Sequence, residues 1–266
     1  MSEQWQSRIL PLSLAKDQEK ELVDIMERYI VRNIPRCDKS TCHEFARLGT
    51  ATVYEAQGKT GLLSDSMKPI QQGAAVCGPA VTVICPAGDN LMIHASVECC
   101  QPGDILVVTT EGESNKNGMI GELVARSLMK RGVRAVIMDG GIRDTTEIRE
   151  LGLPIWTTAV VCTGTIKSKA GWVNAPAVCA GALVNPGDLI VANDDGVVVV
   201  KRGDIPQALE KSLAREKKEE GTRSKIEAGQ FGIDFYGFRE VLAKLGVTYY
   251  DTLEQAAESA RVKGKK

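Results

Sequence analysis

The residues best suited to do chemistry in this chain are an arginine and an aspartate placed side by side, Arg143 and Asp144. They follow the apolar segment 133–139, which is typical of a β-strand, and Gly140 and Gly141 interrupt it. Loops at strand ends often hold functional side chains on a rigid scaffold. Such a pair can offer a cationic fork to an anion and a carboxylate ligand to a divalent metal ion. A surface ion pair, with the aspartate capping the next helix, explains the same pattern equally well.

A helix predicted to begin at Gly121 supplies a second candidate feature. The first-turn amides of Leu123 and Val124 would lack partners inside that helix, and such N–H groups readily donate hydrogen bonds to a carboxylate. Glu122 places an acid in the same turn. Spacing alone does not say whether this turn lies close to the arginine–aspartate pair. If it does, a substrate carboxylate could contact the amides and the guanidinium while a hydrated metal ion binds the aspartate.

The composition is that of an ordinary globular protein. Of 266 residues, 43% are hydrophobic and 25% are charged. A chain of this length and composition can bury a stable core without disulfide bonds or a structural metal ion. Its net charge of -1 gives no electrostatic case for binding nucleic acid or an anionic membrane. No apolar run approaches the roughly 20 residues of a transmembrane helix, and the polar residues 1–20 do not resemble a secretory signal. We therefore expect a cytoplasmic protein with no nucleic-acid or membrane partner.

Cysteine is frequent, but its spacing predicts no metal site. The chain has 8 cysteines, no C-x-x-C pair and only 2 histidines, which excludes the usual zinc patterns. Cys77, Cys85, Cys162 and Cys179 stand among apolar or small residues. In a reducing compartment we expect them to be small buried hydrophobic residues rather than disulfides or nucleophiles. A metal site, if present, should use oxygen ligands.

Helical and strand patterns follow one another along the chain and predict an α/β fold. An amphipathic helix is predicted over 15–31, a polar linker over 36–41 and a second helix over 46–56. Strands are predicted at 80–84, 105–109, 133–138 and 154–157, with helices near 90–98, 121–131 and 145–151. These strands are apolar without strict alternation, which favours a sheet covered on both faces.

The C-terminal third begins with a predicted hairpin and continues as a charged helix. Apolar segments 189–191 and 197–200 flank Asp194-Asp195-Gly196, a turn sequence. Residues 206–220 predict a helix with many charges, either solvated and held by i,i+4 ion pairs or crossing to a neighbouring subunit. A small strand at 247–250, a short helix and a Lys-rich terminus complete the prediction.

The segment Gly121-Glu122-Leu123-Val124-Ala125, followed 21 residues after Glu122 by Arg143-Asp144, resembles the RraA-like superfamily. The resemblance extends from about Leu48 to Asp251 and is closest to the class II pyruvate aldolases that act on 4-hydroxy-4-methyl-2-oxoglutarate and 4-carboxy-4-hydroxy-2-oxoadipate. It implies an α/β fold with an RraA-like layered α/β/β/α core over 46–266, carrying a long C-terminal helical arm. An N-terminal helical extension would cover 1–45. It also implies a homo-oligomer, a trimer or hexamer, with sites between subunits.

The resemblance implies roles for the residues of both candidate features. Asp144 would bind Mg²⁺ or Mn²⁺, largely through waters, and Arg143 would bind the pyruvyl group and stabilise the enolate oxygen. The amides of Leu123 and Val124, next to Gly121, would take the pyruvate carboxylate. Glu122 would hold a water that removes the proton from the substrate hydroxyl; many members of the superfamily have Asp at this position.

Further residues are implied at the rim of the site. A glutamate from the C-terminal helix of an adjacent subunit would complete the metal shell, and Glu219 fits best, with Glu216 and Glu220 as alternatives. Asn90 and Lys167 resemble positions that contact the distal carboxylate of the substrate. Lys167 is also compatible with a plain solvated loop cation.

The implied reaction is a metal-dependent retro-aldol cleavage of a 4-hydroxy-2-keto diacid to pyruvate and a second 2-keto acid, with oxaloacetate decarboxylation as a side activity. A non-catalytic regulator of ribonuclease activity is the rival from another class, because the superfamily includes such protein-binding inhibitors. Those regulators resemble shorter chains without the charged helix and the segment 232–237, which favours the aldolase. A dedicated oxaloacetate decarboxylase with the same site is a third reading that the sequence does not separate.

Overall fold

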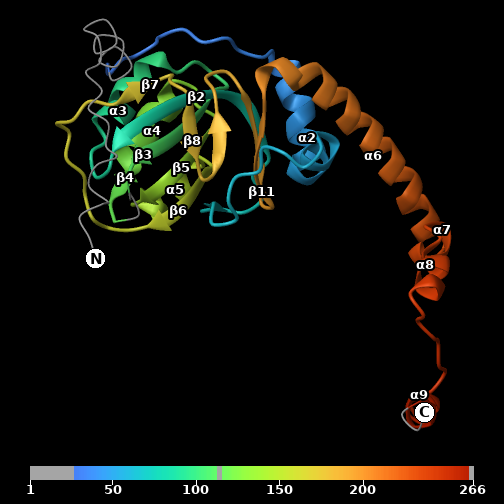
Figure 1. Cartoon of the computed structure of the whole chain (residues 1–266). Helices are drawn as coiled ribbons and strands as arrows, with labels where there is room; N and C mark the ends of the chain where they lie inside the picture. The colour runs from blue at the N-terminus through green and yellow to red at the C-terminus, as the bar shows by residue number, and fades with distance from the viewer. Residues whose placement is uncertain (1–26, 113–115, 264–266) are drawn as a thin grey trace, which may run out of the picture. The chain divides into compact units, whose positions relative to one another are not determined.

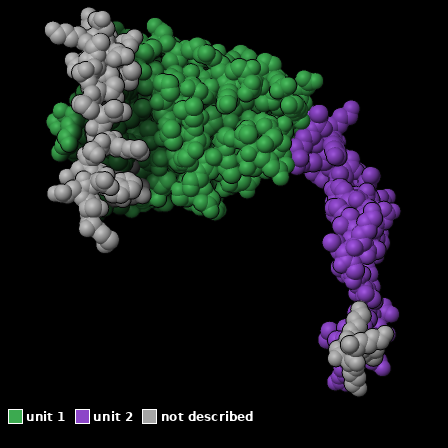
Figure 2. Space-filling model, in the orientation of Figure 1, with its two compact units in different colours: residues 1–213 green, residues 214–266 purple. Residues whose placement is uncertain are grey.

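The computed structural model describes residues 27–112 and 116–263 (Figure 1). Its internal contacts divide the chain into two compact units, residues 1–213 and 214–266, which Figure 2 colours separately. The helix predicted over 15–31 lies mostly outside the described residues, and its last residues, 27–31, form no helix. The division predicted between 1–45 and 46–266 therefore stays a prediction. No helix in the described ranges is long and apolar enough to cross a membrane.

A mixed sheet of nine strands forms the centre of the first unit, in the order β1-β6-β5-β3-β2-β10-β11, with β4 paired to β5 and β7 paired to β2. Strands β2, β3, β5 and β6 run parallel to one another, whereas β1, β7 and β10 pair antiparallel with them, and all four predicted strands are present. The strands are β1 (Lys68–Pro69), β2 (Val76–Pro86), β3 (Ile105–Glu111), β4 (Gly118–Ile120), β5 (Ala135–Ile142), β6 (Ile155–Val160), β7 (Trp172–Val173), β10 (Leu189–Asn193) and β11 (Gly196–Val200). A separate hairpin is made of β8 (Ala177–Cys179) and β9 (Ala182–Val184).

Both faces of this sheet are buried, as the strand composition predicts. In β3, Leu106 and Val108 face a core formed with α3 (Leu91–Ser96), α4 (Glu122–Lys130) and α5 (Thr145–Leu151). Ile105 and Val107 face the opposite core, which includes residues of the β8–β9 hairpin. All four side chains are fully buried, so the strand has no polar face and its hydrophobicity does not alternate.

The helix α2 (Lys39–Ala56), which is broken at Gly49 (φ 77°, ψ 164°), begins earlier than predicted, so the second half of the predicted linker 36–41 is helical. Asp38 caps the helix, because its carboxylate accepts a hydrogen bond of 2.9 Å from the backbone N–H of Thr41. Phe45 and Val53 bury one face of α2 against β10 and β11. The cap is a local signal that apolar spacing alone does not detect.

The glycines 140 and 141 do not end their strand, contrary to the sequence prediction. Strand β5 continues to Ile142 and pairs with both β4 and β6, with a register shift between Met138 and Gly141 on the β6 side. A Cβ at position 141 would lie 2.5 Å from the carbonyl oxygen of Asn117. Glycine is needed there because the chain leading into β4 passes directly against β5.

The helix α6 (Ile205–Glu227) leads into the second unit, which continues with α7 (Gly232–Phe235), α8 (Phe238–Lys244) and α9 (Leu253–Lys263). The ion pairs predicted on α6 are present: Glu219 pairs with Arg215 at 2.9 Å and with Arg223 at 3.7 Å. The strand predicted at 247–250 is wrong. The described residues 214–263 contain no strand with which it could pair.

Candidate active site

Seven residues singled out from the sequence line one cavity of about 140 Å³ in the first unit. They are Asn90, Gly121, Leu123, Val124, Arg143, Asp144 and Lys167, joined by His94, Gly118 and Thr165. The cavity is formed at the carboxyl ends of parallel strands, where α/β proteins generally bind their ligands.

The pairing of β4 with β5 brings the two candidate features together. Gly118 lies opposite Gly141 and Ile120 opposite Ile142 in a parallel ladder. The ladder continues one bond further, because the backbone N–H of Arg143 donates to the carbonyl of Ile120 at 2.9 Å. The turn after β4 and the arginine–aspartate pair after β5 therefore leave the sheet side by side, which the 21-residue spacing by itself could not establish.

Asp144 occupies the N-cap position of α5 but does not cap that helix. Its backbone is left-handed, with φ 55° and ψ 42°, and its side chain makes no capping hydrogen bond. Instead its Oδ2 accepts a hydrogen bond of 3.1 Å from the backbone N–H of Glu122 and lies 3.7 Å from Nε of Arg143. A non-glycine residue in this conformation is strained, and such strain commonly occurs at functional sites. The capping alternative is therefore wrong, and the ion pair is real but loose.

Two glycines leave the space that this arrangement needs. A Cβ at Gly121 would lie 2.5 Å from Oδ2 of Asp144, and one at Gly118 would lie 2.8 Å from Cβ of Arg143. Gly121 has extended backbone, φ -124°, so its requirement is for space and not for an unusual φ. Any side chain at position 121 would push the aspartate out of its place.

The N-terminus of α4 faces the same cavity with unused amides. Gly121 offers no side-chain cap, and the N–H of Glu122 is taken by Asp144. The N–H groups of Leu123 and Val124 have no intrahelical partner because they belong to the first turn. Together with the Arg143 guanidinium they form a cationic, donor-rich corner suited to a carboxylate.

Glu122 takes part in this corner through its backbone N–H, and its side-chain carboxylate points elsewhere. Its carboxylate pairs with Arg126, one turn further along α4, and the residue does not line the cavity. A role for Glu122 in handling protons would require the carboxylate to leave Arg126. That role stays a prediction.

Asn90 is buried at the far wall, and half of its amide has no partner. Its Nδ2 donates to the carbonyl of Met119 at 2.9 Å, which fixes the orientation of the amide. Its Oδ1 accepts no hydrogen bond from any described residue. A buried acceptor left unpaired is costly in a finished fold and is common where a ligand binds.

Lys167 is held at the cavity by a buried carboxylate beside it. Asp89 accepts hydrogen bonds from the backbone N–H of Leu91, Ser168 and Lys169 at 2.7–2.9 Å. Burial raises the pKa of Asp89, but these hydrogen bonds outweigh it, and the net pKa is below the ordinary value. The loop with Lys167 is thereby fastened to the start of α3.

His94 is the ionisable lining residue that sequence reasoning missed, and Thr165 was missed as well. His94 lies one turn after Asn90 on α3, and its backbone N–H donates to the Asn90 carbonyl at 3.2 Å. Partial burial, and then the charge of Lys167, lower its pKa, which favours the neutral imidazole at pH 7. The four-residue spacing from Asn90 to His94 was the available signal, because it places both on one helical face.

Carboxylate metal ligands are sparse around this cavity. Asp144 is the only acidic residue that lines it, and no group of three His, Cys, Asp or Glu suited to a metal ion occurs among residues 27–112 and 116–263. Glu216 and Glu219 lie on the part of α6 that belongs to the second unit. Their predicted contribution to a metal site stays a prediction.

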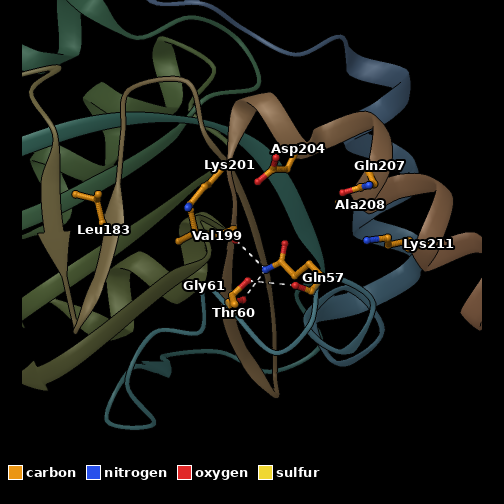
Figure 3. A pocket seen from close by; sticks show the side chains of 10 residues that line it. All are labelled: Gln57, Thr60, Gly61, Leu183, Val199, Lys201, Asp204, Gln207, Ala208 and Lys211. Atoms are coloured by element: carbon orange, nitrogen blue, oxygen red, sulfur yellow. Dashed lines mark hydrogen bonds between the residues drawn. The ribbon is translucent and has the colours of Figure 1, made fainter.

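A different cavity, of about 170 Å³, lies where α2, β11 and the start of α6 meet, and Figure 3 shows it. It contains none of the residues predicted from the sequence. The amide of Gln57 that points into it already donates to the carbonyls of Thr60 and Val199, at 2.5 and 3.0 Å. This amide is therefore already bonded within the chain, unlike the Oδ1 of Asn90.

Comparison with known proteins gives the fold and the family. A family model described as RraA-like, Aldolase/RraA, matches residues 50–199. A Halalkalibacterium halodurans protein provisionally named 4-hydroxy-4-methyl-2-oxoglutarate aldolase is 28% identical over 193 residues, 73% of this chain and 91% of that protein. A Burkholderia multivorans protein with the same provisional name is 30% identical over 144 residues, 54% of this chain and 87% of that protein.

Solved structures agree with this match. Streptomyces coelicolor RraAS2, described as an unusual member of the RNase ES inhibitor RraA protein family, is 31% identical with a TM-score of 0.64, covering 72% of this chain and 99% of that one. The RNA-processing inhibitor RraA from Thermus thermophilis has a TM-score of 0.52 at 24% identity, which shows the fold alone. The predicted α/β, RraA-like fold is confirmed.

Proposed function

The chain belongs to the RraA-like Aldolase/RraA family, and we propose that it is a carbon–carbon lyase that releases pyruvate from a 4-hydroxy-2-keto diacid. The observation that carries the proposal is the cavity in which Arg143, the amides of Leu123 and Val124, and the Asp144 carboxylate converge. The first three suit a 2-keto carboxylate, and the fourth suits a hard cation. The provisional names of the two bacterial relatives agree with this reaction.

The donor set fits a hydrated Mg²⁺ or Mn²⁺. Mg²⁺ typically uses one or two carboxylates and keeps several waters. The Asp144 side chain is 42% exposed, and only its Oδ2 is engaged by described residues. Asp144 would hold the ion, which when bound would act as a Lewis acid toward the 2-keto group. We propose that Glu219 or Glu216 of a second copy completes the shell.

In the proposed reaction the chain binds the substrate by its 2-keto acid end. We propose that the 4-hydroxyl gives its proton to a water held by Glu122, whose carboxylate must first leave Arg126. The C3–C4 bond breaks, and the electron pair moves toward the C2 oxygen. The resulting enolate then takes up a proton at C3 to give pyruvate. Arg143 places a fixed positive charge where that negative charge develops, and it needs no reorganisation to do so. Loss of CO₂ from oxaloacetate would generate the same enolate, which is why we propose decarboxylation as a side activity.

The other end of the substrate would meet Asn90 and Lys167. The Lys167 ammonium suits a distal carboxylate, and the unpartnered Oδ1 of Asn90 suits a hydroxyl or amide donor. A lysine for a carboxylate and an amide oxygen for a hydroxyl together predict that the protein prefers diacids that carry a hydroxyl group. Asn90 and Lys167 therefore affect the choice of substrate, whereas Arg143 and Asp144 affect the chemistry.

We also propose that the protein works as a homo-oligomer, with sites between copies. Leu123 and Ile166, around the site, leave 76% and 54% of their surfaces exposed. Val160 nearby is 57% exposed. Apolar side chains of this size beside a polar cavity mark a surface that is commonly covered by another chain.

A coupled pyruvate assay tests the enzymatic proposal. Oxaloacetate, 4-hydroxy-4-methyl-2-oxoglutarate and 4-carboxy-4-hydroxy-2-oxoadipate are supplied in turn, with Mg²⁺ and then with a chelator. We expect metal-dependent pyruvate release that Asp144→Ala abolishes. Glu147→Ala, which removes an exposed acid from α5 outside the cavity, is the matched control. Wild-type turnover in Asp144→Ala contradicts the proposal.

The non-catalytic alternative is favoured by a specific observation, the 31% identity to RraAS2 over nearly its whole length. A regulator of that kind would act by binding a ribonuclease. Absence of metal-dependent pyruvate from all three substrates, together with direct binding to an RNase E-type enzyme, would favour it over the lyase.

A further inference from the structure

Three cysteines meet at the N-terminal end of α2, and none of them lines the candidate active site. Cys37 precedes the helix, Cys42 lies in its first turns, and Cys77 lies on β2. All three line a cavity of about 200 Å³, together with Asp38 and Arg134. No disulfide joins them, since all eight cysteines are free.

The contacts within this thiol cluster single out Cys42. Cys37 and Cys77 line the same cavity as Cys42, and both thiols lower its pKa. The Cys77 contact has the largest effect on the pKa of Cys42 and lowers it. Burial and Asp38 oppose that effect, while Cys37 and Arg134 add to it, and the net pKa lies below its ordinary value. Two S–H donors and one cation therefore favour a thiolate at Cys42.

Its two neighbours behave in the opposite way. Burial, and then the charges of Cys42 and Asp38, raise the pKa of Cys37 to about 11. The hydrogen bond that Cys77 makes to Cys42, together with its own burial, raises the pKa of Cys77 well above its usual value. A cluster in which one thiol ionises more readily than its two neighbours is the arrangement needed for a nucleophile and a second thiol that traps its oxidised form.

We propose that Cys42 is an oxidant-sensitive nucleophile and that hydroperoxides close a disulfide between Cys42 and Cys37. The proposal does not depend on the lyase activity, because it uses none of the residues assigned to that reaction.

The proposed chemistry balances in two steps. The Cys42 thiolate attacks one oxygen of hydrogen peroxide, the O–O bond breaks, and Cys42 becomes a sulfenic acid while hydroxide leaves. The Cys37 sulfur then attacks the Cys42 sulfur, the S–O bond breaks, and the Cys37 proton leaves with the oxygen as water. Two electrons pass from the two sulfurs to the peroxide, which is reduced to two waters once the hydroxide takes up a proton.

Cys37 is preferred over Cys77 as the second thiol because it lies outside regular secondary structure, whereas Cys77 is held in a strand. A disulfide requires the two sulfurs to approach to about 2.05 Å, closer than any hydrogen bond between thiols. Cys77 is fully buried on β2, where it lies opposite Val191 of β10 in a continuous ladder. Cys37 is half-buried and belongs to neither a helix nor a strand.

Trypsin distinguishes the two possible disulfides without any mutation. Cleavage after Arg36, Lys39 and Arg47 separates Cys37, in peptide 37–39, from Cys42, in peptide 40–47, while Cys77 lies in peptide 60–116. We expect hydrogen peroxide, added to the full-length protein, to remove two free thiols per chain. It should link peptides 37–39 and 40–47 in a form that dithiothreitol reverses. A link from 40–47 to 60–116 overturns the assignment of Cys37.

Matched variants test each thiol in turn. Cys77→Ala should keep the link, whereas Cys37→Ser should lose it and leave Cys42 as a sulfenic acid that dimedone labels. Cys162→Ser, which removes an exposed thiol outside the cluster, should leave the link unchanged. An unmodified Cys42 in wild-type protein, at a peroxide dose that oxidises Cys162 in peptide 150–167, overturns the proposal.

Discussion

Arg36 and Asp104 lie at the end of the sheet where β3 begins, whereas Arg143 and Asp144 lie at the opposite end, where β5 finishes. The first pair is bidentate, with both N–O distances at 2.9 Å, and the Asp104 side chain is 1% exposed. The second pair has one contact of 3.7 Å, and both side chains are more than 40% exposed. The same two residue types therefore make a closed structural bond at one end and an open, charged corner at the other.

The difference indicates how the fold separates stability from chemistry. Asp104 has its oxygens taken by Arg36 and by the backbone N–H of Gln101, at 2.7 Å, so little is left for a ligand. Asp144 has only one oxygen engaged, and that by a backbone amide. Groups that finish the fold are fully bonded, whereas groups reserved for a ligand keep unused bonding capacity.

The largest expected effect falls on the closed pair. Asp104→Ala leaves the mostly buried Arg36 guanidinium without its carboxylate, which should lower the free energy of unfolding by about 3–5 kcal/mol. Urea denaturation measures the change. Asp144→Ala, at the other end of the sheet, is the control and should move the midpoint little. Equal losses in the two variants would contradict the separation of stability from chemistry.

The next effect falls on the open pair. Arg143→Ala should lower kcat/KM for pyruvate release by about 10²–10³-fold, because it removes a preorganised charge next to the developing enolate. The melting temperature should stay within a few degrees of wild type, on the order of a 1 kcal/mol change. Arg143→Lys keeps the charge but loses the fork, so it should recover only part of the rate. A large drop in melting temperature would instead make Arg143 a structural residue.

A smaller effect tests the space around Asp144. Gly121→Ala places a Cβ 2.5 Å from Oδ2 of Asp144, and we expect turnover to fall by about 10²-fold at most because the carboxylate moves. Gly203→Ala is the matched control, since a Cβ there meets nothing within 4 Å. Unchanged turnover in Gly121→Ala would mean that the position of Asp144 does not matter for the reaction.

The smallest effect concerns Asp89, a fully bonded carboxylate at the functional end of the sheet. Its pKa is lowered in the folded chain, so its contribution to stability is present above about pH 4, its unfolded value, and is lost as pH falls through the folded value. Urea midpoints measured from pH 7 down to pH 3 should fall more steeply for wild type than for Asp89→Asn. Parallel curves would show that Asp89 does not titrate with folding.

Much of the first unit could be predicted from the sequence because its signals are local and repeated. Buried parallel strands are continuous apolar runs, and the predicted strands and the Asp194-Asp195-Gly196 hairpin are found where expected. The failures come from tertiary contacts. Gly140 and Gly141 continue β5 because a neighbouring segment passes against them, and residues 247–250 lack a partner strand. Apolar patterning also placed Cys162 inside, whereas it is exposed.

Tertiary contacts also limited what the sequence could predict about individual residues of the candidate site. Residue types and a family resemblance were enough to select Arg143 and Asp144, but not to show that Asp144 bonds to the backbone of the turn after β4. That contact depends on β4 lying beside β5, which no spacing rule contains. His94 was missed because its relevance comes from the wall on which it lies and not from any motif.

The hydrogen bond from the Glu122 backbone to Asp144 has a consequence for how this protein can be varied. The aspartate is held by a main-chain group, so its position is indifferent to the side chain carried at residue 122. That residue can be replaced by any residue except proline, which has no backbone N–H, while the anchor stays intact, provided Gly121 before it is kept. Substitutions at position 122 therefore test the Glu122 side chain separately from the position of Asp144.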